Sequence, residues 1–231
     1  LQDRYAAQPQ QAIEDLLELS RLAGPQLRAI NFYPVQILRA WKDALPAADP
    51  LHAFIAQQNV LGASTTGGSD RADIFLGDGA ANAFAGGAGD DSLDGGAGAD
   101  LLQGGSGDDV LIGGRGNDTL NGGVHDPYWG TYNGAGNDTY CFNRGDGQDT
   151  INDHDTSAGN LDKLIFGKGI RPSDITLTRT LNGALVLKLV DADDQVTING
   201  YFFDDAAGGW AIEEIHFAED PATVWTTADV K

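Results

Sequence analysis

Aspartates and glycines recur at a fixed nine-residue spacing in the middle of the chain. The phrase occurs four times without interruption between Gly86 and Asn121, as GGAGDDSLD, GGAGADLLQ, GGSGDDVLI and GGRGNDTLN, and Gly122-Gly123 begin a fifth copy. The sixth position always supplies a carboxylate. Calcium is a hard cation that takes six to eight oxygen ligands from carboxylates and carbonyls. One such turn cannot complete a site, so neighbouring turns would have to share each ion.

Three glycines within four positions let the backbone of each repeat reach positive φ, which a tight turn requires. Such a turn can direct its carbonyl oxygens toward a cation. Weaker copies of the phrase lie at 68–76 and 77–85 before the regular ones, and at 133–141 and 144–152 after them. The predicted metal-binding residues are the sixth-position side chains and the turn glycines of this array: Asp73, Asn82, Gly87, Gly89, Asp91, Gly96, Gly98, Asp100, Gly105, Gly107, Asp109, Gly114, Gly116, Asp118, Asp138 and Asp149.

The last three residues of each repeat must position these turns. They are too few for a helix and suit a short strand, whose middle residue points to one face while its neighbours point to the other. This middle residue, at position eight, is apolar throughout. The candidate core residues are Phe75, Phe84, Leu93, Leu102, Leu111 and Leu120, with Trp129 next if the fifth copy keeps the spacing.

The phrase resembles the RTX, or haemolysin-type, calcium-binding nonapeptide repeat. The resemblance implies a mainly β fold, a right-handed parallel β-roll in which one coil takes two repeats, with several calcium ions between successive turns. Asp73, Asp91 and Asp109 would then line one edge, and Asn82, Asp100 and Asp118 the other. The two copies at 68–85 depart from the pattern, because Ser69 and Arg71 replace glycines and Asn82 replaces an aspartate. Calcium sites at that end should be weaker or missing.

Helices are expected before the repeats. Apolar residues fall near one face of a segment from about 10 to 22, which Gly24-Pro25 would end, and Pro34 and Pro50 suit the first turns of two short helices. Residues 1–60 are therefore predicted to be a helical segment. They would pack on the first coil or form the end of a larger upstream domain. Residues 61–67 are predicted to be a linker, and 68–153 the roll.

Residues 154–231 alternate like antiparallel strands and are predicted to cap the roll. The stretches DKLIFGKGIRPSDITLTR, QVTINGYF and IEEIHFAEDPATVW resemble the domain found downstream of haemolysin-type calcium repeats. A cap is needed because the last coil would otherwise expose unpaired backbone and an apolar column. The expected strands are 161–166, 175–179, 184–190, 195–199, 212–217 and 224–226.

The charge of the chain limits the classes of partner that it can bind. The formal net charge is −20, and the repeat region holds fifteen aspartates, no glutamate and three arginines. Binding to nucleic acid or to an anionic membrane is unfavourable for such a surface, whereas metal cations suit it. Without calcium, a disordered glycine- and aspartate-rich segment is the favoured interpretation. The sequence contains no apolar run of about 18 residues, so no transmembrane segment is predicted.

The resemblance implies a non-catalytic module of a secreted bacterial protein, toxin-like or part of an exoenzyme. It would leave the cell unfolded through type I secretion machinery and fold outside on binding calcium, as a monomer. No nucleophile elbow, zinc-protease helix or phosphate loop occurs, and His154, Asp155 and Ser157 are interpreted as a polar loop rather than a triad. An adhesin or other surface-binding module stiffened by calcium remains the alternative.

Overall fold

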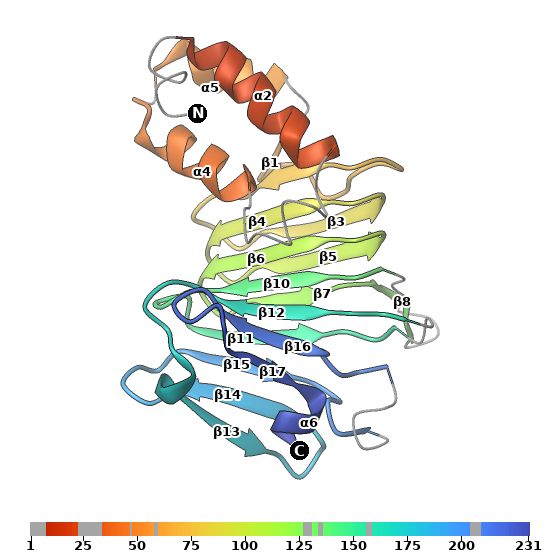
Figure 1. Ribbon diagram of the computed structural model, residues 1–231. Coiled ribbons are helices and arrows are strands. Elements are labelled where there is room, and N and C mark those ends of the chain that lie inside the picture. Colours follow the sequence, from red (N-terminus) through yellow and green to blue (C-terminus); the bar gives the residue numbers. More distant parts are fainter. Residues whose placement is uncertain are drawn as a thin grey trace.

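The computed structural model describes residues 8–22, 34–46, 48–57, 60–126, 131–133, 136–155, 159–203 and 209–231. Strands are stacked along most of the molecule, and the longer helices lie at its N-terminal end (Figure 1). The helices are α2 (Pro9–Leu22), α4 (Pro34–Ala44), α5 (Pro50–Gln57), the 3-10 helix η1 (Pro172–Asp174) and α6 (Thr227–Val230). The strands are β1 (Val60–Gly62), β2 (Ile74–Leu76), β3 (Ala83–Ala88), β4 (Ser92–Ala97), β5 (Leu101–Ser106), β6 (Val110–Arg115), β7 (Thr119–Asn121), β8 (Val124–Asp126), β9 (Thr131–Asn133), β10 (Thr139–Phe142), β11 (Gln148–Asn152), β12 (Lys163–Phe166), β13 (Ile175–Arg179), β14 (Leu185–Leu189), β15 (Gln195–Ile198), β16 (Glu214–Phe217) and β17 (Val224–Thr226).

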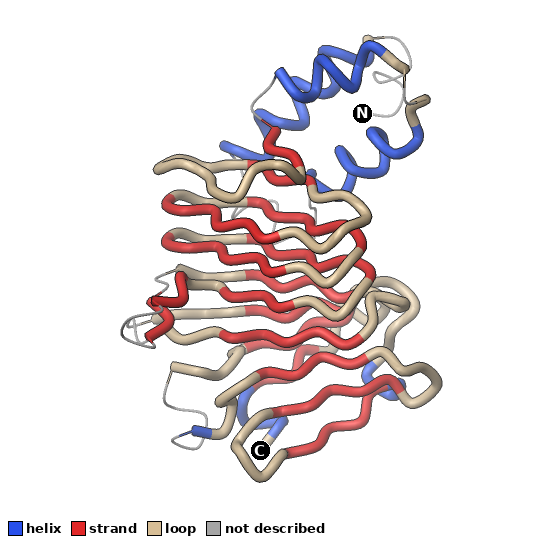
Figure 2. The backbone as a smooth tube through the Cα atoms, turned by 180° about the vertical axis from the view of Figure 1, so that it is seen from behind, coloured by secondary structure: helices blue, strands red, loops and turns tan. Residues whose placement is uncertain are grey.

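Two sheets face each other across the stack, and the chain alternates between them (Figure 2). The first sheet has the order β1-β2-β4-β6-β10-β12-β16-β17, and the second has the order β13-β14-β15-β11-β7-β5-β3. Within the repeats every neighbouring pair in each sheet is parallel, as in β2 with β4 and β3 with β5. The fold is therefore mainly β, with parallel sheets consistent with a β-roll.

The two inward columns have the predicted register. Leu93 pairs with Phe75 and Leu111 in the first sheet, and Leu102 pairs with Phe84 and Leu120 in the second. All six side chains are buried in one core. Phe75 and Phe84 stack with ring centroids 4.3 Å apart, so the larger side chains of the two irregular copies fill the N-terminal end of this core.

The strands are longer than predicted. β4, β5 and β6 each have six residues, because strand pairing continues from positions seven to nine into the first three positions of the next repeat. Positions four to six join the strands, and the glycine at position two already has positive φ. Glycines at the first two positions permit the continuation, because the strands of adjacent coils approach closely there.

The fifth copy does not keep the nine-residue spacing. Tyr140, not Trp129, follows Leu111 in the first column, and Ile151 follows Leu120 in the second. Between Leu120 and Tyr140 the chain leaves the stack and forms the antiparallel hairpin of β8 and β9. Trp129 itself lies outside the described residues, as does the predicted helix end at Gly24-Pro25.

The N-terminal helices α2, α4 and α5 pack on the outside of the first sheet. Their apolar side chains form a second core with the outward side chains of that sheet. The helical contribution comes from Ile13, Leu16, Leu17, Val35, Leu38 and Ile55, and that of the sheet from Ile74, Leu76, Val110, Ile112, Cys141 and Ile165. Pro34 and Pro50 are the first residues of α4 and α5. The predicted linker at 61–67 takes part in the stack instead, since Leu61 pairs with Phe75 in parallel strands and Gly67 bridges to Ala85.

The C-terminal segment continues the roll, which corrects the expectation of antiparallel strands alone. β12 and β16 extend the first sheet in parallel, and β15 extends the second in parallel with β11. Only β13, β14 and β17 add antiparallel pairings. The physical reason is that the cap strands offer the same apolar column positions as the repeats, because Leu164 pairs with Tyr140 and Ile215 pairs with Leu164.

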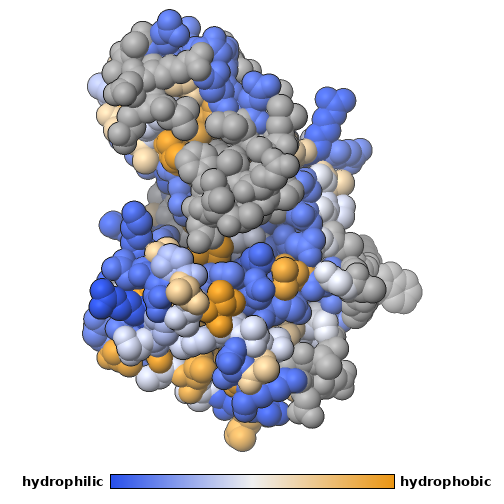
Figure 3. All heavy atoms as spheres, viewed as in Figure 1, coloured by the Kyte–Doolittle hydropathy of each residue, from blue (hydrophilic) through white to orange (hydrophobic). Residues whose placement is uncertain are grey.

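The visible surface is mostly hydrophilic, and apolar side chains gather toward the C-terminal strands (Figure 3). Several of these strands and their loops carry exposed apolar residues, among them Leu177, Leu181, Val190 and Phe203. None of the helices in the described part of the chain is both long and apolar enough to cross a membrane.

Candidate metal centre

The sixth-position side chains form two ladders of hydrogen bonds along the edges of the roll. In the first ladder, the backbone N–H of Asp73 donates to Asp91 Oδ1 at 2.7 Å, and that of Asp91 donates to Asp109 Oδ1 at 2.8 Å. In the second, Asn82 donates to Asp100 at 2.7 Å and Asp100 to Asp118 at 2.8 Å. Each bond joins residues eighteen positions apart. The predicted division into two edges is therefore confirmed.

The second oxygen of these carboxylates is left for a ligand. Among the described residues, Oδ2 of Asp91, Asp100 and Asp118 is buried and has no hydrogen-bond partner. It lies over the first glycine of its own repeat, so that a Cβ at Gly86 or Gly95 would overlap it. A buried carboxylate oxygen without a partner costs free energy unless a cation approaches. This observation shows that the residues present fit a bound metal ion.

The turn glycines have the backbone conformation that the repeat requires. The glycines at positions two and four all have positive φ: Gly87, Gly89, Gly96, Gly98, Gly105, Gly107, Gly114 and Gly116. The coils also pack closely at position two, since a Cβ at Gly105 would overlap the carbonyl oxygen of Gly87. The turns thus place backbone carbonyls beside the carboxylates, which is the all-oxygen environment that calcium prefers.

Burial raises the pKa of these carboxyl groups above its usual value. The pKa rises to about 7 at Asp91, to about 6 at Asp118 and to about 8 at Asp149. Desolvation is the main cause in each case, and hydrogen bonds from the backbone of the preceding coil oppose it. The pKa of Asp100 is raised for the same reason. The edges therefore concentrate negative charge where it is poorly solvated, and a divalent cation would stabilise the charged form.

The first ladder continues beyond the repeats. The N–H of Asp109 donates to Asp138 at 2.9 Å, that of Asp138 to Asp162 at 2.8 Å, and that of Asp162 to Glu213 at 2.7 Å. Asp138 was predicted, but Asp162 and Glu213 were not. Asp162 lies two positions before the inward residue Leu164, and Glu213 lies two positions before Ile215. Positions six and eight of a repeat have the same spacing, which could have identified both acidic residues from the sequence.

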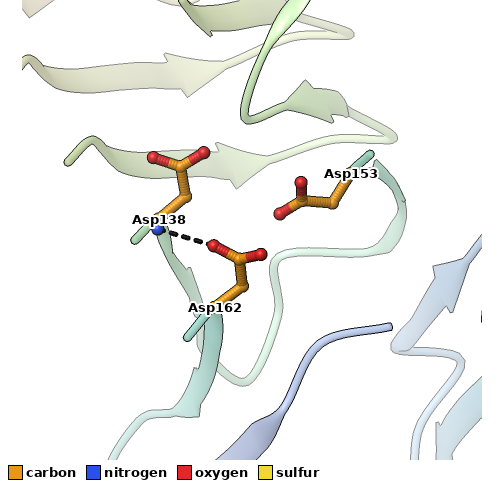
Figure 4. A group of neighbouring side chains, drawn as sticks. All are labelled: Asp138, Asp153 and Asp162. Carbon is orange, nitrogen blue, oxygen red and sulfur yellow. Dashed lines mark hydrogen bonds between the residues drawn. The ribbon is translucent and has the colours of Figure 1, made fainter. Parts of the chain in front are cut away.

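Three buried carboxylates meet at this end of the ladder (Figure 4). Asp138, Asp153 and Asp162 are all buried, and one oxygen from each lies within 4.8 Å of the others. The hydroxyl of Tyr140 donates to Asp153 Oδ2 at 2.9 Å. Burial, followed by the charge of Asp153, raises the pKa of Asp162 to about 9. The group has the oxygen chemistry of a calcium or magnesium site.

This cluster adjoins the predicted polar loop of His154, Asp155 and Ser157, which has no regular secondary structure at 153–155 but buries Asp155. Asp153 and Asp155 are both buried. The ring of His154 instead lies 4.4 Å from that of Trp210, centroid to centroid. Ser157 lies outside the described residues. Asp153 was missed because it belongs to no repeat, and only the return of the chain past Asp138 brings it to the ladder.

The first coil differs from the regular ones in the hydrogen bonds of its sixth-position side chains. Asp73 Oδ2 accepts hydrogen bonds from the backbone N–H and the hydroxyl of Ser69 at 2.6 and 2.9 Å. Asn82 Oδ1 accepts the N–H of Asp78 at 3.0 Å. These oxygens are already used by local bonds. On the second edge, Asp149 Oδ1 accepts the N–H of Asp118 at 3.0 Å, which places the predicted Asp149 in the next rung.

Comparison with known proteins agrees with this geometry. Residues 67–102 and 94–124 match the model of the RTX calcium-binding nonapeptide repeat, and residues 185–229 match the haemolysin-type calcium binding protein related domain. Iron-regulated protein FrpA of Neisseria meningitidis serogroup C is 41% identical over 93 residues, which are 40% of this chain and 8% of that protein. The chain thus spans less than a tenth of this relative. It carries RTX calcium-binding nonapeptide repeats followed by a haemolysin-type calcium binding protein related domain.

Proposed function

We propose that this chain is a calcium-dependent folding module. The observation that carries the proposal is the pair of carboxylate ladders. Among the described residues, the buried Oδ2 atoms of Asp91, Asp100 and Asp118 in these ladders have no hydrogen-bond partner. The same oxygens lie beside backbone turns held open by glycine. These residues, with the neighbouring turn carbonyls, would hold the calcium ions.

The energetics favour folding only with the cation. Stacking the coils brings like charges together and removes them from water, and the many glycines lose much conformational entropy when they become ordered. Calcium supplies the opposite charge when bound. Extracellular calcium modules bind at about 10⁻⁴ to 10⁻³ M. With such affinities the chain would be unfolded in the cytosol and folded outside the cell. The right-handed sense of the coil belongs to the proposal, because parallel strands joined by crossovers are nearly always right-handed.

The acidic cluster supports further sites toward the C-terminal end. Asp138 and Asp162 continue the ladder, and Asp153 adds a carboxylate from a different segment. A cation held there would join the last repeats to the first strand of the C-terminal domain. The ions on the first ladder would therefore extend past the sequence repeats.

The test is equilibrium calcium binding by the whole chain. Asp91→Asn and Asp118→Asn remove one carboxylate charge from each ladder and keep the side-chain shape. Each variant is expected to bind fewer calcium ions than the parent, or to bind them about tenfold more weakly. The control is Asp70→Asn, which makes the same change at an exposed aspartate. Equal losses in all three variants would mean that net charge, rather than the ladders, holds the ions.

We also propose that the chain belongs to a secreted bacterial protein, toxin-like or an exoenzyme, and leaves the cell through type I secretion machinery. The support is the matched repeat family and the calcium switch that the ladders provide. The proposal assigns no catalytic role to this chain, which would act outside the cell as a monomer. Coexpression with a type I apparatus should place the chain in the medium, and its retention in the cytosol would contradict export.

A further inference from the structure

The N-terminal helices dock on a surface that exists only when the roll is formed. Ile74, Val110 and Cys141 stand on different coils and project outward from the first sheet, where they meet Leu38 and other helical residues. In the linear sequence these outward residues are far apart. Helix α4 has eleven residues, and helices of that length are marginal in water without packing. The helices therefore depend on the sheet for their apolar partner.

A charged contact joins α4 to two neighbouring coils of the first sheet, at Gly77 and Asp94. Arg39 Nε lies 2.6 Å from Asp94 Oδ2, a close charge contact without the alignment of a hydrogen bond. Arg39 Nη2 donates to the backbone carbonyl of Asp94 at 2.8 Å, and both Nη atoms donate to the carbonyl of Gly77 at 3.3 Å. The side chain of Asp94 is 4% exposed and that of Arg39 is 18% exposed.

This contact can form only when two coils are stacked. The carbonyl of Asp94 also accepts the backbone N–H of Gly77 at 2.8 Å, so Arg39 binds at the junction where one coil rests on the next. Gly77 begins the copy that has Asn82 in place of the sixth-position aspartate. A guanidinium, with several donors in a rigid fork, suits a carboxylate together with adjacent carbonyl oxygens. Here the chain supplies its own cation.

We infer that Arg39 latches the N-terminal helices to the calcium-ordered roll, so that α4 docks only when the coils at Gly77 and Asp94 are stacked. The inference rests on the proposed function, because calcium is what orders those coils. Its consequence is that calcium controls a second event, the seating of the helical segment, in addition to the folding of the repeats. Asp94 remains buried beside a cation only while the helix is docked.

Hydrogen–deuterium exchange of the full chain tests this latch. Peptides from 34–44 report on α4, and peptides from 92–121 report on the roll. In the parent protein, both regions should be protected with calcium and both should exchange rapidly in chelator. Arg39→Ala with calcium should leave the strands protected and accelerate exchange of α4 by at least about tenfold, because a buried charge has lost its partner. Arg115→Ala is the matched control, since this exposed arginine lines the same cleft beside α4.

A second variant shows whether the pair acts as a unit. Asp94→Asn should also release α4, and the double variant Arg39→Ala/Asp94→Asn should release it no more than Arg39→Ala alone. Fully additive effects would overturn the latch. So would unchanged protection of α4 in Arg39→Ala, or loss of protection in the strands of that variant. In the parent chain, strands that need no calcium would contradict the proposed function. Strands that open in chelator while α4 stays protected would contradict the latch alone.

Discussion

At the scale of single residues, each carboxylate in a ladder contacts the coil before it and not the opposite edge. The N–H of Asp91 donates to Asp109, whereas Asp100 belongs to the other ladder. Alanine substitution at Asp91 and Asp109 should therefore be strongly coupled, by about 0.5–3 kcal/mol, and substitution at Asp91 and Asp100 more weakly. The measurement is the calcium midpoint of folding for the single and double variants. Stronger coupling between Asp91 and Asp100 would contradict two separate edges.

Glycine is required where the coils touch. Gly105 has a φ of +121°, and an added Cβ would overlap the carbonyl of Gly87. Gly105→Ala should destabilise the calcium-bound fold by about 1–3 kcal/mol, through backbone strain and the lost contact. Gly79→Ala is the control, because nothing lies within 4 Å of its added Cβ. Denaturant unfolding with saturating calcium measures the free energy of unfolding of both variants. Equal values would show that the folded coils do not require glycine at position 105.

The raised pKa values predict how acid acts on the calcium-free chain. The folded-state pKa is about 6 at Asp118, about 7 at Asp91 and about 8 at Asp149, compared with about 3.8 when unfolded. A carboxyl group whose pKa is raised by folding stabilises the folded state at low pH. This stabilisation is complete below the unfolded-state pKa, and it is lost as the pH rises through the folded-state pKa. Metal-free protein should therefore gain β structure as pH falls from 8 to 5. Circular dichroism measures the change, and loss of β structure over that range would contradict it.

At the scale of elements, the repeat predicted the register but not the length of the strands. The nine-residue period fixed which residues pair, as Leu93 with Leu111 shows. It could not show that positions one to three continue each strand, because glycines there favour turns when a sequence is considered locally. The hairpin of β8 and β9 also broke the count. Tyr140 was therefore not recognised as the next core residue, although it is paired with Leu111.

The C-terminal strands were located but their pairing was not. Period-two alternation is the same for parallel and antiparallel strands, so β12, β15 and β16 gave no sign that they extend the roll. Asp153 was missed for a related reason, because its approach to Asp138 depends on this continuation. Residues that act through a repeat can be identified from sequence. Residues brought together by the return of the chain cannot.

The two ends of the roll should contribute unequally to calcium-dependent folding. Removing residues 161–231 would uncover Tyr140 and Ile151 and end both sheets at β10 and β11. Removing residues 1–59 would uncover the outer face near Ile74 but leave both columns intact. In a stacked array, stability is roughly a sum of local and neighbour contributions. The C-terminal truncation should therefore raise the calcium midpoint much more.

Calcium titration of both truncated chains by circular dichroism checks this order. The untruncated protein provides the reference midpoint under the same conditions. Equal midpoints in the two truncations, or a larger increase after removal of the helices, would show that folding does not depend chiefly on the C-terminal side.

At the scale of the whole molecule, two cores share one sheet. The inner core runs along the roll into the C-terminal domain, and the outer core joins the first sheet to the helices. The formal charge of −20 opposes this compact arrangement. Under the proposed function, ordering of the turns by calcium is the event on which both cores depend.

The most direct measurement is the far-ultraviolet circular dichroism of the full chain during a calcium titration. At neutral pH in chelator, the 68–153 region should lack β structure, and calcium at about 10⁻⁴ to 10⁻³ M should convert the spectrum cooperatively to a β-rich one. Magnesium should substitute poorly, because it requires a smaller octahedral shell. A spectrum that is the same in chelator and in millimolar calcium would contradict calcium-dependent folding.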